Sequence, residues 1–268
     1  WPSNLQLLDW LAVDFRKSDW NVKRMLKQMI MSSTYRQNAR ASSQLVELDP
    51  ENRLLGRGPR FRLQAEFIRD TILSASGLLV KDIGGRGVKP YQPPGLWNEV
   101  SLGGNVRFVQ DHGAKLYRRG MYTYWKRSAP APSLTIFDTP TREKCVLRRS
   151  RTNTPLQALV LLNDPQYIEA ARSLAQKVTL ETGDSVVARI VLAYRLATAQ
   201  RPSARTLRLL TAAYEEELAV FRKDPDRAKK LLSTGESKRD ENIDAAEHAA
   251  LTIISSMILN LDATVTKG

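Results

Sequence analysis

Apolar residues recur every three to four positions near the start of the chain, which is the spacing of an amphipathic helix. This spacing predicts helices over residues 5–15, 21–31 and 63–76. Gly77 directly follows the third of these segments, and glycine is the residue that most often ends a helix. The N-terminal region is therefore expected to be helical.

The same period returns after residue 152. Asn153 or Thr154, followed by Pro155, forms a cap and first-turn pair, and Asp164-Pro165 repeats this arrangement for the next helix. Removing the first cap is expected to cost about 1 kcal/mol. Further helices are predicted from about residues 184 and 203, and a last one over 244–262, whereas the polar stretch 224–242 is predicted to be an exposed loop.

Between these regions, glycines and prolines interrupt residues 79–138, as in Gly84-Gly85, Pro93-Pro94-Gly95 and Gly103-Gly104. Short alternating stretches at 106–109 and 116–125 predict a small β-hairpin or sheet. We therefore predict a mainly α fold with an irregular, loop-rich central segment. Its parts are an N-terminal helical part (1–79), an irregular basic segment (80–151) and a C-terminal helical part (152–268), expected to pack as one unit.

Charge is concentrated in the central segment. The chain of 268 residues carries a formal charge of +13. Residues 107–151 contain eleven basic and three acidic residues, a net charge of +8, whereas residues 203–268 contain ten basic and eleven acidic ones. The central segment is therefore the part expected to attract an anionic partner.

Aromatic and basic residues are interleaved in this segment. Arginine presents a planar fork to carboxylate, sulfate or phosphate, and aromatic rings stack on sugars or bases. The alternative is that the rings pack internally and the arginines stay solvated or pair with Asp138 and Glu143. The candidate anion-binding residues are Arg118, Arg119, Tyr124, Trp125, Arg127, Arg148 and Arg149.

The chain lacks the residues that several classes of enzyme and cofactor site require. The single cysteine, Cys145, excludes an internal disulfide and a zinc site built on cysteine pairs, and we expect it to be a buried, unreactive thiol. His112 is interpreted as a turn residue, and His248 fits the period of the last helix. Gly84, Gly85 and Gly87 precede no Gly-Lys-Ser/Thr, so they are interpreted as turn glycines.

The longest apolar run, residues 251–261, is too short to span a bilayer, so no membrane span is expected. The chain begins at Trp1 without a signal segment. It is therefore interpreted as a piece of a longer protein, whose export signal would lie upstream.

Several motifs follow one another along the chain: Ser33-Thr34-Tyr35-Arg36-Gln37, Asp49-Pro50-Glu51-Asn52-Arg53, Pro59-Arg60-Phe61-Arg62-Leu63 with Glu66 and Arg69-Asp70, Tyr117-Arg118-Arg119-Gly120-Met121-Tyr122 with Trp125-Lys126-Arg127, Phe137-Asp138-Thr139-Pro140 with Arg142, Thr152 to Leu159 with Leu162-Asn163-Asp164, and Leu259-Asn260-Leu261-Asp262. With these motifs, the sequence resembles the C-terminal domain of unknown function of planctomycete-type cytochrome c proteins, the DUF1553 family. The resemblance extends over essentially the whole chain. Two departures, Thr206 and Ala263, replace acidic residues that are common in the family.

The resemblance implies a parent protein that is exported, periplasmic or on the cell surface, with haem c held by another segment. No cofactor is expected in this chain, which has no Cys-x-x-Cys-His. The leading hypothesis is an accessory or interaction domain whose basic surface docks an acidic protein, another domain of the parent chain or an anionic glycan. The alternative is part of an enzyme cleft for anionic polysaccharide, with Asp138 or Glu66 as acid/base candidate. Nucleic-acid binding follows from charge alone and conflicts with export.

Overall fold

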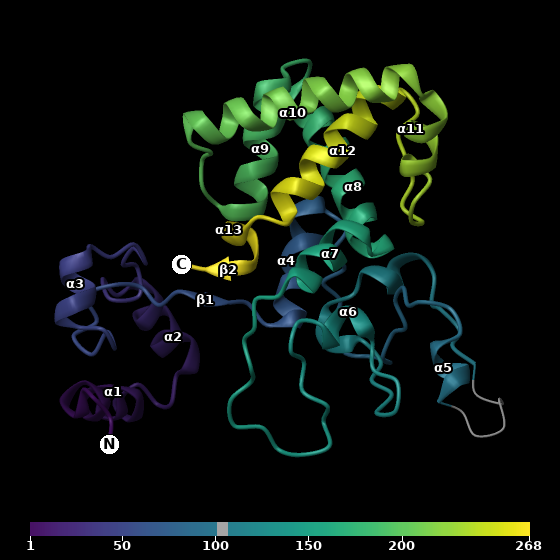
Figure 1. The fold of residues 1–268 in the computed structure, drawn as a ribbon. Helices are drawn as coiled ribbons and strands as arrows, with labels where there is room; N and C mark the ends of the chain where they lie inside the picture. Colours follow the sequence, from purple (N-terminus) through teal and green to yellow (C-terminus); the bar gives the residue numbers. More distant parts are fainter. Residues whose placement is uncertain (101–106) are drawn as a thin grey trace. The chain divides into compact units, whose positions relative to one another are not determined.

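The computed structural model describes residues 1–100 and 107–268, so the predicted loop glycines 103 and 104 and the start of the predicted alternation at 106 lie outside the described residues. The chain forms two units, residues 1–61 with 267–268 (unit 1) and residues 62–266 (unit 2). Figure 1 shows the elements of each unit in the order of the chain. Each unit is described by itself below.

Unit 1 contains the helices α1 (Leu5–Lys17), α2 (Val22–Met31) and α3 (Ser43–Leu48). The first two were predicted, and α3 has too few residues to show a helical period. Asn21 caps α2, because its side chain accepts a hydrogen bond from the Arg24 backbone N–H at 3.0 Å. None of the three helices contains a buried residue.

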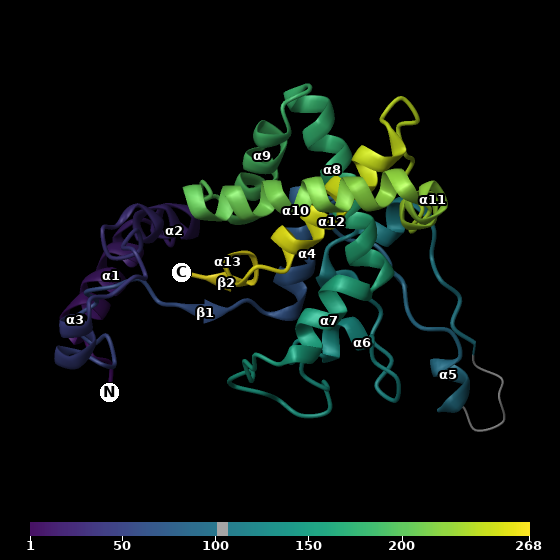
Figure 2. The ribbon, with the colours of Figure 1, turned by 45° about the horizontal axis from the view of Figure 1, so that its top comes forward.

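Unit 2 is built around α8, which packs against α4, α7, α9 and α12. The longer α10 crosses α12 in both ribbon views (Figures 1 and 2) and packs against it. The helices of this unit are α4 (Ala65–Ser76), α5 (Leu96–Glu99), α6 (Pro132–Thr135), α7 (Pro155–Asn163), α8 (Pro165–Thr182), α9 (Val186–Thr198), α10 (Ala204–Lys223), α11 (Pro225–Leu232), α12 (Ala245–Leu259) and α13 (Asp262–Val265).

The core of unit 2 follows from the helical period of these segments. Ile68 and Ile72 on α4, Leu174 on α8, and Ile254 and Ile258 on α12 are all buried in one cluster. A side chain of this type contributes roughly 1.5–3 kcal/mol when it is fully buried. The core therefore joins α4 from the N-terminal part of the sequence to helices that follow residue 152.

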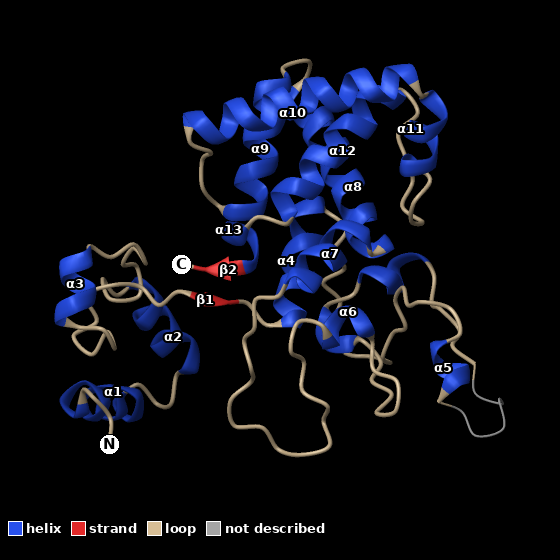
Figure 3. Ribbon diagram, in the orientation of Figure 1, coloured by secondary structure: helices blue, strands red, loops and turns tan. Residues whose placement is uncertain are grey.

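The mainly α fold is confirmed, and Figure 3 shows how little of the chain is strand. Strands β1 (Phe61–Arg62) and β2 (Thr266–Lys267) form a two-stranded sheet. The hairpin predicted at 116–125 is wrong. This stretch contains the end of one 3-10 turn, η1 (Gly113–Tyr117), and the whole of a second, η2 (Gly120–Tyr122), and its Arg118 and Thr123 form isolated bridges with Val80 and Val88. Leu116 and Tyr117 are buried with Leu73 of α4, whereas Met121 and Tyr124 are 64% and 48% exposed, so the alternation does not mark the two faces of a strand.

Two local predictions are also corrected. The stretch 224–242 is not wholly a loop, since Asp224 caps α11 and the Ala228 and Leu232 side chains of that helix are buried. Thr154 precedes Pro155 at the start of α7, as predicted, but its side chain makes no capping hydrogen bond. The expected loss of about 1 kcal/mol on removing this cap therefore lacks its physical basis.

Candidate functional site

Arg69 on α4 fixes the path of the central segment. Its side chain is buried, and its Nε donates to the Gln166 side chain at 2.9 Å. The two terminal nitrogens donate to the backbone carbonyls of Leu116, at 2.6 Å, and Arg118. Because both carbonyls belong to the irregular segment, one guanidinium attaches that segment to α4 and α8.

Asp70, the next residue on α4, holds the following turn. Its Oδ1 accepts a hydrogen bond from the Gly120 backbone N–H at 2.6 Å. Gly120 lies so close to α4 that an added Cβ would be 3.0 Å from the Glu66 Cα. The Tyr117–Tyr122 stretch therefore lies directly against the helix, with Arg118 projecting from it.

Arg118 organises the neighbouring glycine-containing loop. Its guanidinium donates to the backbone carbonyls of Asp82, Gly84 and Arg86 at 3.1, 2.5 and 3.2 Å. The same group lies 3.9 Å from the centre of the Tyr122 ring. A planar guanidinium matches this combination of stacking and several acceptors. Arg118 therefore contributes its charge from a fixed position.

Next to Arg118 is a groove of about 420 Å³, which we call the basic groove. The residues that line it, all within the described part of the chain, are Arg86, Gly87, Val88, Lys89, Val109, Asp111, Lys115, Arg118 and Tyr124. Four of these side chains are cationic and one is anionic. The groove is therefore electropositive.

The one carboxylate of the groove is already used locally. Asp111 Oδ2 accepts from the Lys89 backbone N–H at 2.8 Å, and Asp111 Oδ1 lies 3.7 Å from the Lys115 ammonium. The Lys89 ammonium lies 5.4 Å from the centre of the Tyr124 ring and 5.2 Å from that of Trp97. At these distances the ring faces attract the Lys89 ammonium and hold it in place.

A second group of predicted residues meets at a smaller cleft. Arg149 lies 2.7 Å from the Glu66 carboxylate, and Asp138 Oδ2 accepts from the Thr152 backbone N–H and hydroxyl at 2.7 and 2.8 Å. Asp138 and Arg149 both line this cleft, together with Arg62. Both acid/base candidates therefore hold the segment 149–152 in place.

The remaining predicted residues lie elsewhere on unit 2. Trp125 donates from its indole nitrogen to the Thr141 carbonyl at 3.0 Å, and the Arg142 guanidinium lies 4.8 Å from its ring centre. Arg119 is half-buried, whereas Arg127 and Arg148 are exposed and form no ion pair with any described residue. Of the seven anion-binding candidates, Arg118 and Tyr124 line the basic groove.

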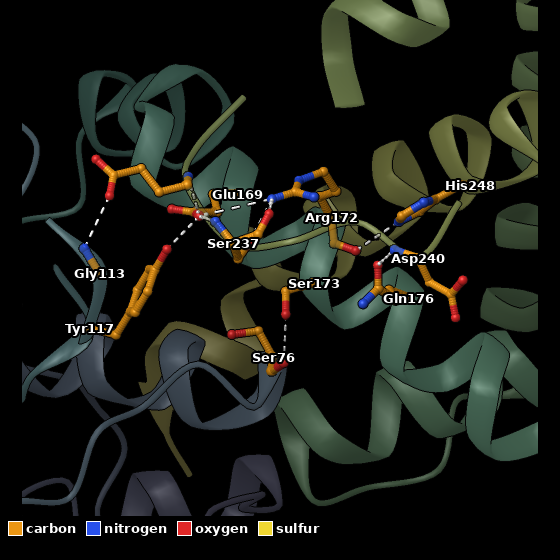
Figure 4. A network of polar contacts seen from close by, with 11 residues as sticks. Ser76, Gly113, Tyr117, Glu169, Arg172, Ser173, Gln176, Ser237, Asp240 and His248 are labelled. Atoms are coloured by element: carbon orange, nitrogen blue, oxygen red, sulfur yellow. Dashed lines mark hydrogen bonds and ion pairs between the residues drawn. The ribbon is translucent and has the colours of Figure 1, made fainter. Parts of the chain in front are cut away.

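Sequence reasoning missed a buried polar network around Glu169 on α8, shown in Figure 4. The Glu169 side chain is fully buried, and its Oε1 accepts from the Tyr117 hydroxyl at 2.7 Å and from the backbone N–H groups of Glu236 and Ser237 at 2.7 and 2.6 Å. An isolated buried carboxylate would be very costly, and these donors compensate for lost hydration. The local sequence gave no signal for it, because the helical neighbours Arg172, Ser173 and Gln176 are polar and indicate an exposed face.

The network continues through Arg172 and His248 (Figure 4). Arg172 donates to the Ser237 carbonyl and hydroxyl, both at 2.6 Å. The His248 Nε2 lies 3.0 Å from the Arg172 carbonyl, so this nitrogen must carry the proton. Burial lowers the pKa of His248 to about 4, which keeps the ring neutral at neutral pH.

The turn at Glu236 and Ser237, which Glu169 holds, also contacts the residues that follow Asp111 of the basic groove. Glu236 accepts from the Gly113 backbone N–H at 3.1 Å and lies 2.6 Å from the His112 Nδ1. These contacts, with the Gly113 hydrogen bond contributing most, lower the pKa of Glu236. Because His112 and Gly113 directly follow Asp111, these contacts connect the Glu169 network to one residue of the groove lining.

Cys145 corrects one expectation. The thiol was predicted to be buried, but Cys145 is exposed, in a stretch where residues 141–148 are all exposed. Residues 1–100 and 107–268 contain no group of histidine, cysteine or acidic residues placed to hold a metal ion. No helix in those ranges is long and apolar enough to cross a membrane.

A family model described as PSD1, a protein of unknown function (DUF1553), matches residues 1–214. The chain belongs to the DUF1553 family. The resemblance found in the sequence motifs is thus confirmed. The DUF1553 match includes the whole lining of the basic groove and Glu169, and it ends within α10, before Glu236 and His248. Neither a curated protein nor a solved structure matches the chain.

Proposed function

We propose that this domain is an interaction module that binds carboxylate groups of an acidic protein partner through the basic groove. The observation that carries the proposal is the set of four cationic side chains around one groove, with a carboxylate that already pairs with Lys115. Electrostatic complementarity of this kind speeds encounter and selects the partner. The role fits an accessory domain of a longer, exported protein.

The arrangement of the cations supports binding over simple solubility. Arg118 is held by three backbone carbonyls, and Lys89 is held over aromatic rings, so neither side chain must be ordered when a ligand arrives. Ordering a free side chain typically costs about 0.5–1.5 kcal/mol on binding. A pre-positioned pair of cations avoids this cost.

The contacts of the two acid/base candidates, Glu66 and Asp138, favour a binding domain over an enzyme. Glu66 and Asp138 each hold the segment 149–152, through an ion pair and hydrogen bonds respectively. A general acid or base must reach the proton it transfers in a bound substrate. These two carboxylates support a positioning role, and we therefore assign them no part in chemistry.

The proposal is tested by charge reversal with a matched control. The double variant Arg86→Glu, Lys115→Glu changes the groove, and Lys229→Glu, Lys230→Glu makes the same charge change on α11. Each double variant also removes one helical-spaced ion pair, Lys115 with Asp111 at 3.7 Å or Lys229 with Asp226 at 3.5 Å. The measurement is the dissociation constant for poly-glutamate by fluorescence anisotropy at several salt concentrations.

We expect the groove variant to weaken poly-glutamate binding at least about tenfold, a change of about 1.4 kcal/mol, and the α11 variant to change it about twofold or less. Equal losses would show that net charge alone attracts the polymer and would refute the groove. Heparin serves as a comparison ligand. If heparin binding depends on the groove and poly-glutamate binding does not, the ligand of the groove is a sulfated glycan and the proposed acidic protein partner is refuted.

A further inference from the structure

Unit 2 contains a second and larger pocket, of about 620 Å³, which we call the proline pocket. It is bordered by α6, α7 and the segment before α5. The residues that line it are Tyr91, Gln92, Pro93, Pro94, Gln110, Pro132, Ser133, Ile136, Leu159, Val160, Asn163, Asp164 and Pro165. Small-molecule sites commonly have this size.

The lining differs from the rest of the chain in its charge. Although the chain has a net charge of +13, no lysine or arginine is among the described residues that line the pocket. Its apolar walls come from four prolines with Ile136, Leu159 and Val160. An anionic ligand would find no counter-charge here.

The lining contains two ionisable groups, the Asp164 carboxyl group, which caps α8, and the Tyr91 hydroxyl. Asp164 accepts from the Gln166 backbone N–H at 2.9 Å, and burial raises the pKa of its carboxyl. Burial and the nearby Glu169 carboxylate raise the pKa of the Tyr91 hydroxyl, which is therefore neutral. With no basic side chain in its lining and its carboxyl group engaged as a helix cap, the pocket suits a ligand without charge.

Two residues of the lining, Tyr91 and Gln92, carry a buried polar atom without a hydrogen-bond partner among the described residues. The Gln92 Nε2 is buried and makes no hydrogen bond with any of the described residues. A buried donor without a partner has lost its hydration without gaining a hydrogen bond, and an acceptor on a ligand would supply that bond. Gln92 therefore marks the polar end of an otherwise apolar site.

We propose that the proline pocket binds an uncharged, mostly apolar small molecule that places a hydrogen-bond acceptor on the Gln92 amide. This site is separate from the basic groove, with which it shares no lining residue. Its ligand differs from the acidic partner in both size and charge. Each proposal can therefore be refuted without affecting the other.

Nile red is a suitable probe, because it is uncharged and apolar, carries one carbonyl acceptor, and changes its emission in apolar surroundings. The critical variant is Leu159→Lys, which places a charge in the pocket lining. Its control is Leu156→Lys, one turn earlier on α7 and outside the lining. The two positions are matched in exposure, because Leu156 is 55% exposed and Leu159 is 54% exposed. The dissociation constant is measured by fluorescence titration.

We expect Leu159→Lys to weaken Nile red binding at least about tenfold, because the ligand loses an apolar contact and meets a charge, and Leu156→Lys to change it about twofold or less. Gln92→Met, which keeps the volume and removes the donor, should weaken binding several-fold. No binding by the unsubstituted chain, or equal losses in both lysine variants, would overturn the proposal.

Two further measurements keep the test independent of variant folding and of the groove. A ¹H–¹⁵N NMR titration of the unsubstituted chain with Nile red should shift the amides of Ser133, Val160 and Asn163; shifts confined to other regions would overturn the site. The groove variant Arg86→Glu, Lys115→Glu should bind Nile red unchanged. Anilinonaphthalene sulfonate, an anionic dye, should not displace Nile red, and displacement would contradict selection against charge.

Discussion

The two units use the same helical period in different ways. In unit 1 the apolar faces of α1 and α2 stay open, with Leu8 51% exposed and Trp10 53% exposed. In unit 2, α12 alone buries ten residues, among them Ile254 and Ile258. The comparison shows that an amphipathic pattern produces a helix in both units but a core in only one, because burial needs a second apolar face to pack against.

The difference has a consequence for local stability. Helices of 13, 10 and 6 residues, as in α1, α2 and α3, are marginal when packing does not support them. Regions with few buried contacts open at a lower free energy than the core. Unit 1 is therefore expected to exchange its amide hydrogens faster than the α8 and α12 helices.

The largest expected effect separates the two units directly. Leu174→Ala on α8 removes a fully buried side chain and should lower the free energy of unfolding by about 2–5 kcal/mol. Leu8→Ala on α1 removes an exposed one and should change it by about 0.5 kcal/mol or less. Urea denaturation of both variants, followed by circular dichroism, makes the comparison; equal losses would show that α1 is packed in solution.

The next effect tests the Glu169 network within unit 2. Gly235 has φ +86, and an added Cβ would lie 2.2 Å from the Glu169 Cδ. Gly235→Ala should therefore lower the free energy of unfolding by roughly 2–4 kcal/mol, from backbone strain and from displacement of the turn. The matched control is Gly95→Ala, where φ is +83 and no atom of the described residues lies within 4 Å of the added Cβ. A loss no larger than the control's would contradict a rigid turn over Glu169.

A pH-dependent effect follows from His248. Its pKa is lowered to about 4 in the folded chain, against about 6.5 when unfolded. Between these values the unfolded state binds the proton and the folded state does not, so stability falls as pH falls from about 6.5 to 4, by up to about 3 kcal/mol. Buried His248→Gln should remove this slope, whereas exposed His112→Gln should keep it. Urea titrations at several pH values measure both, and an unchanged slope in His248→Gln would exclude this histidine as the source.

The smallest effect concerns the helix caps of unit 2. Thr154→Ala should change the free energy of unfolding by less than about 0.5 kcal/mol, since the Thr154 side chain makes no capping bond. Ser203→Ala should cost about 1 kcal/mol, because the Ser203 hydroxyl accepts from the Thr206 backbone N–H at 3.1 Å. Thermal melts of the two variants at one pH distinguish them. A reversed order would mean that Thr154 caps α7 in solution.

Helix positions were the part of the fold that local sequence predicted well. The starts of α8, α9 and α10 follow Asp164, Ser185 and Ser203, each of which caps its helix through a side-chain oxygen. Such caps act within three residues, so their signal is local. The predicted hairpin failed for the converse reason, since Arg69 and Asp70 on α4, a distant part of the chain, hold the backbone of this stretch.

The candidate site was only partly predictable. Charge density indicated the central segment, and Arg118 and Tyr124 do line the basic groove. Arg86 and Lys89, which complete it, lie within the predicted basic segment 80–151 but before residues 107–151, where the excess charge was counted. Contacts distant in sequence hold them there, since Arg118 donates to the Arg86 carbonyl and Asp111 accepts from the Lys89 backbone N–H. Arg149 was predicted for the same face, but it pairs with Glu66 from α4 and lines the smaller cleft.

By itself, the sequence determined the helical class, most helix boundaries, the family and the location of the excess positive charge, because these depend on composition, short-range spacing and motifs. Only the tertiary structure decided which apolar faces are buried, which arginines are held by carbonyls or carboxylates, and that Glu169 supports a turn nearly seventy residues later along the chain at Glu236 and Ser237. The physical reason is that burial and polar pairing depend on partners far apart in sequence, and no local pattern specifies which partners meet.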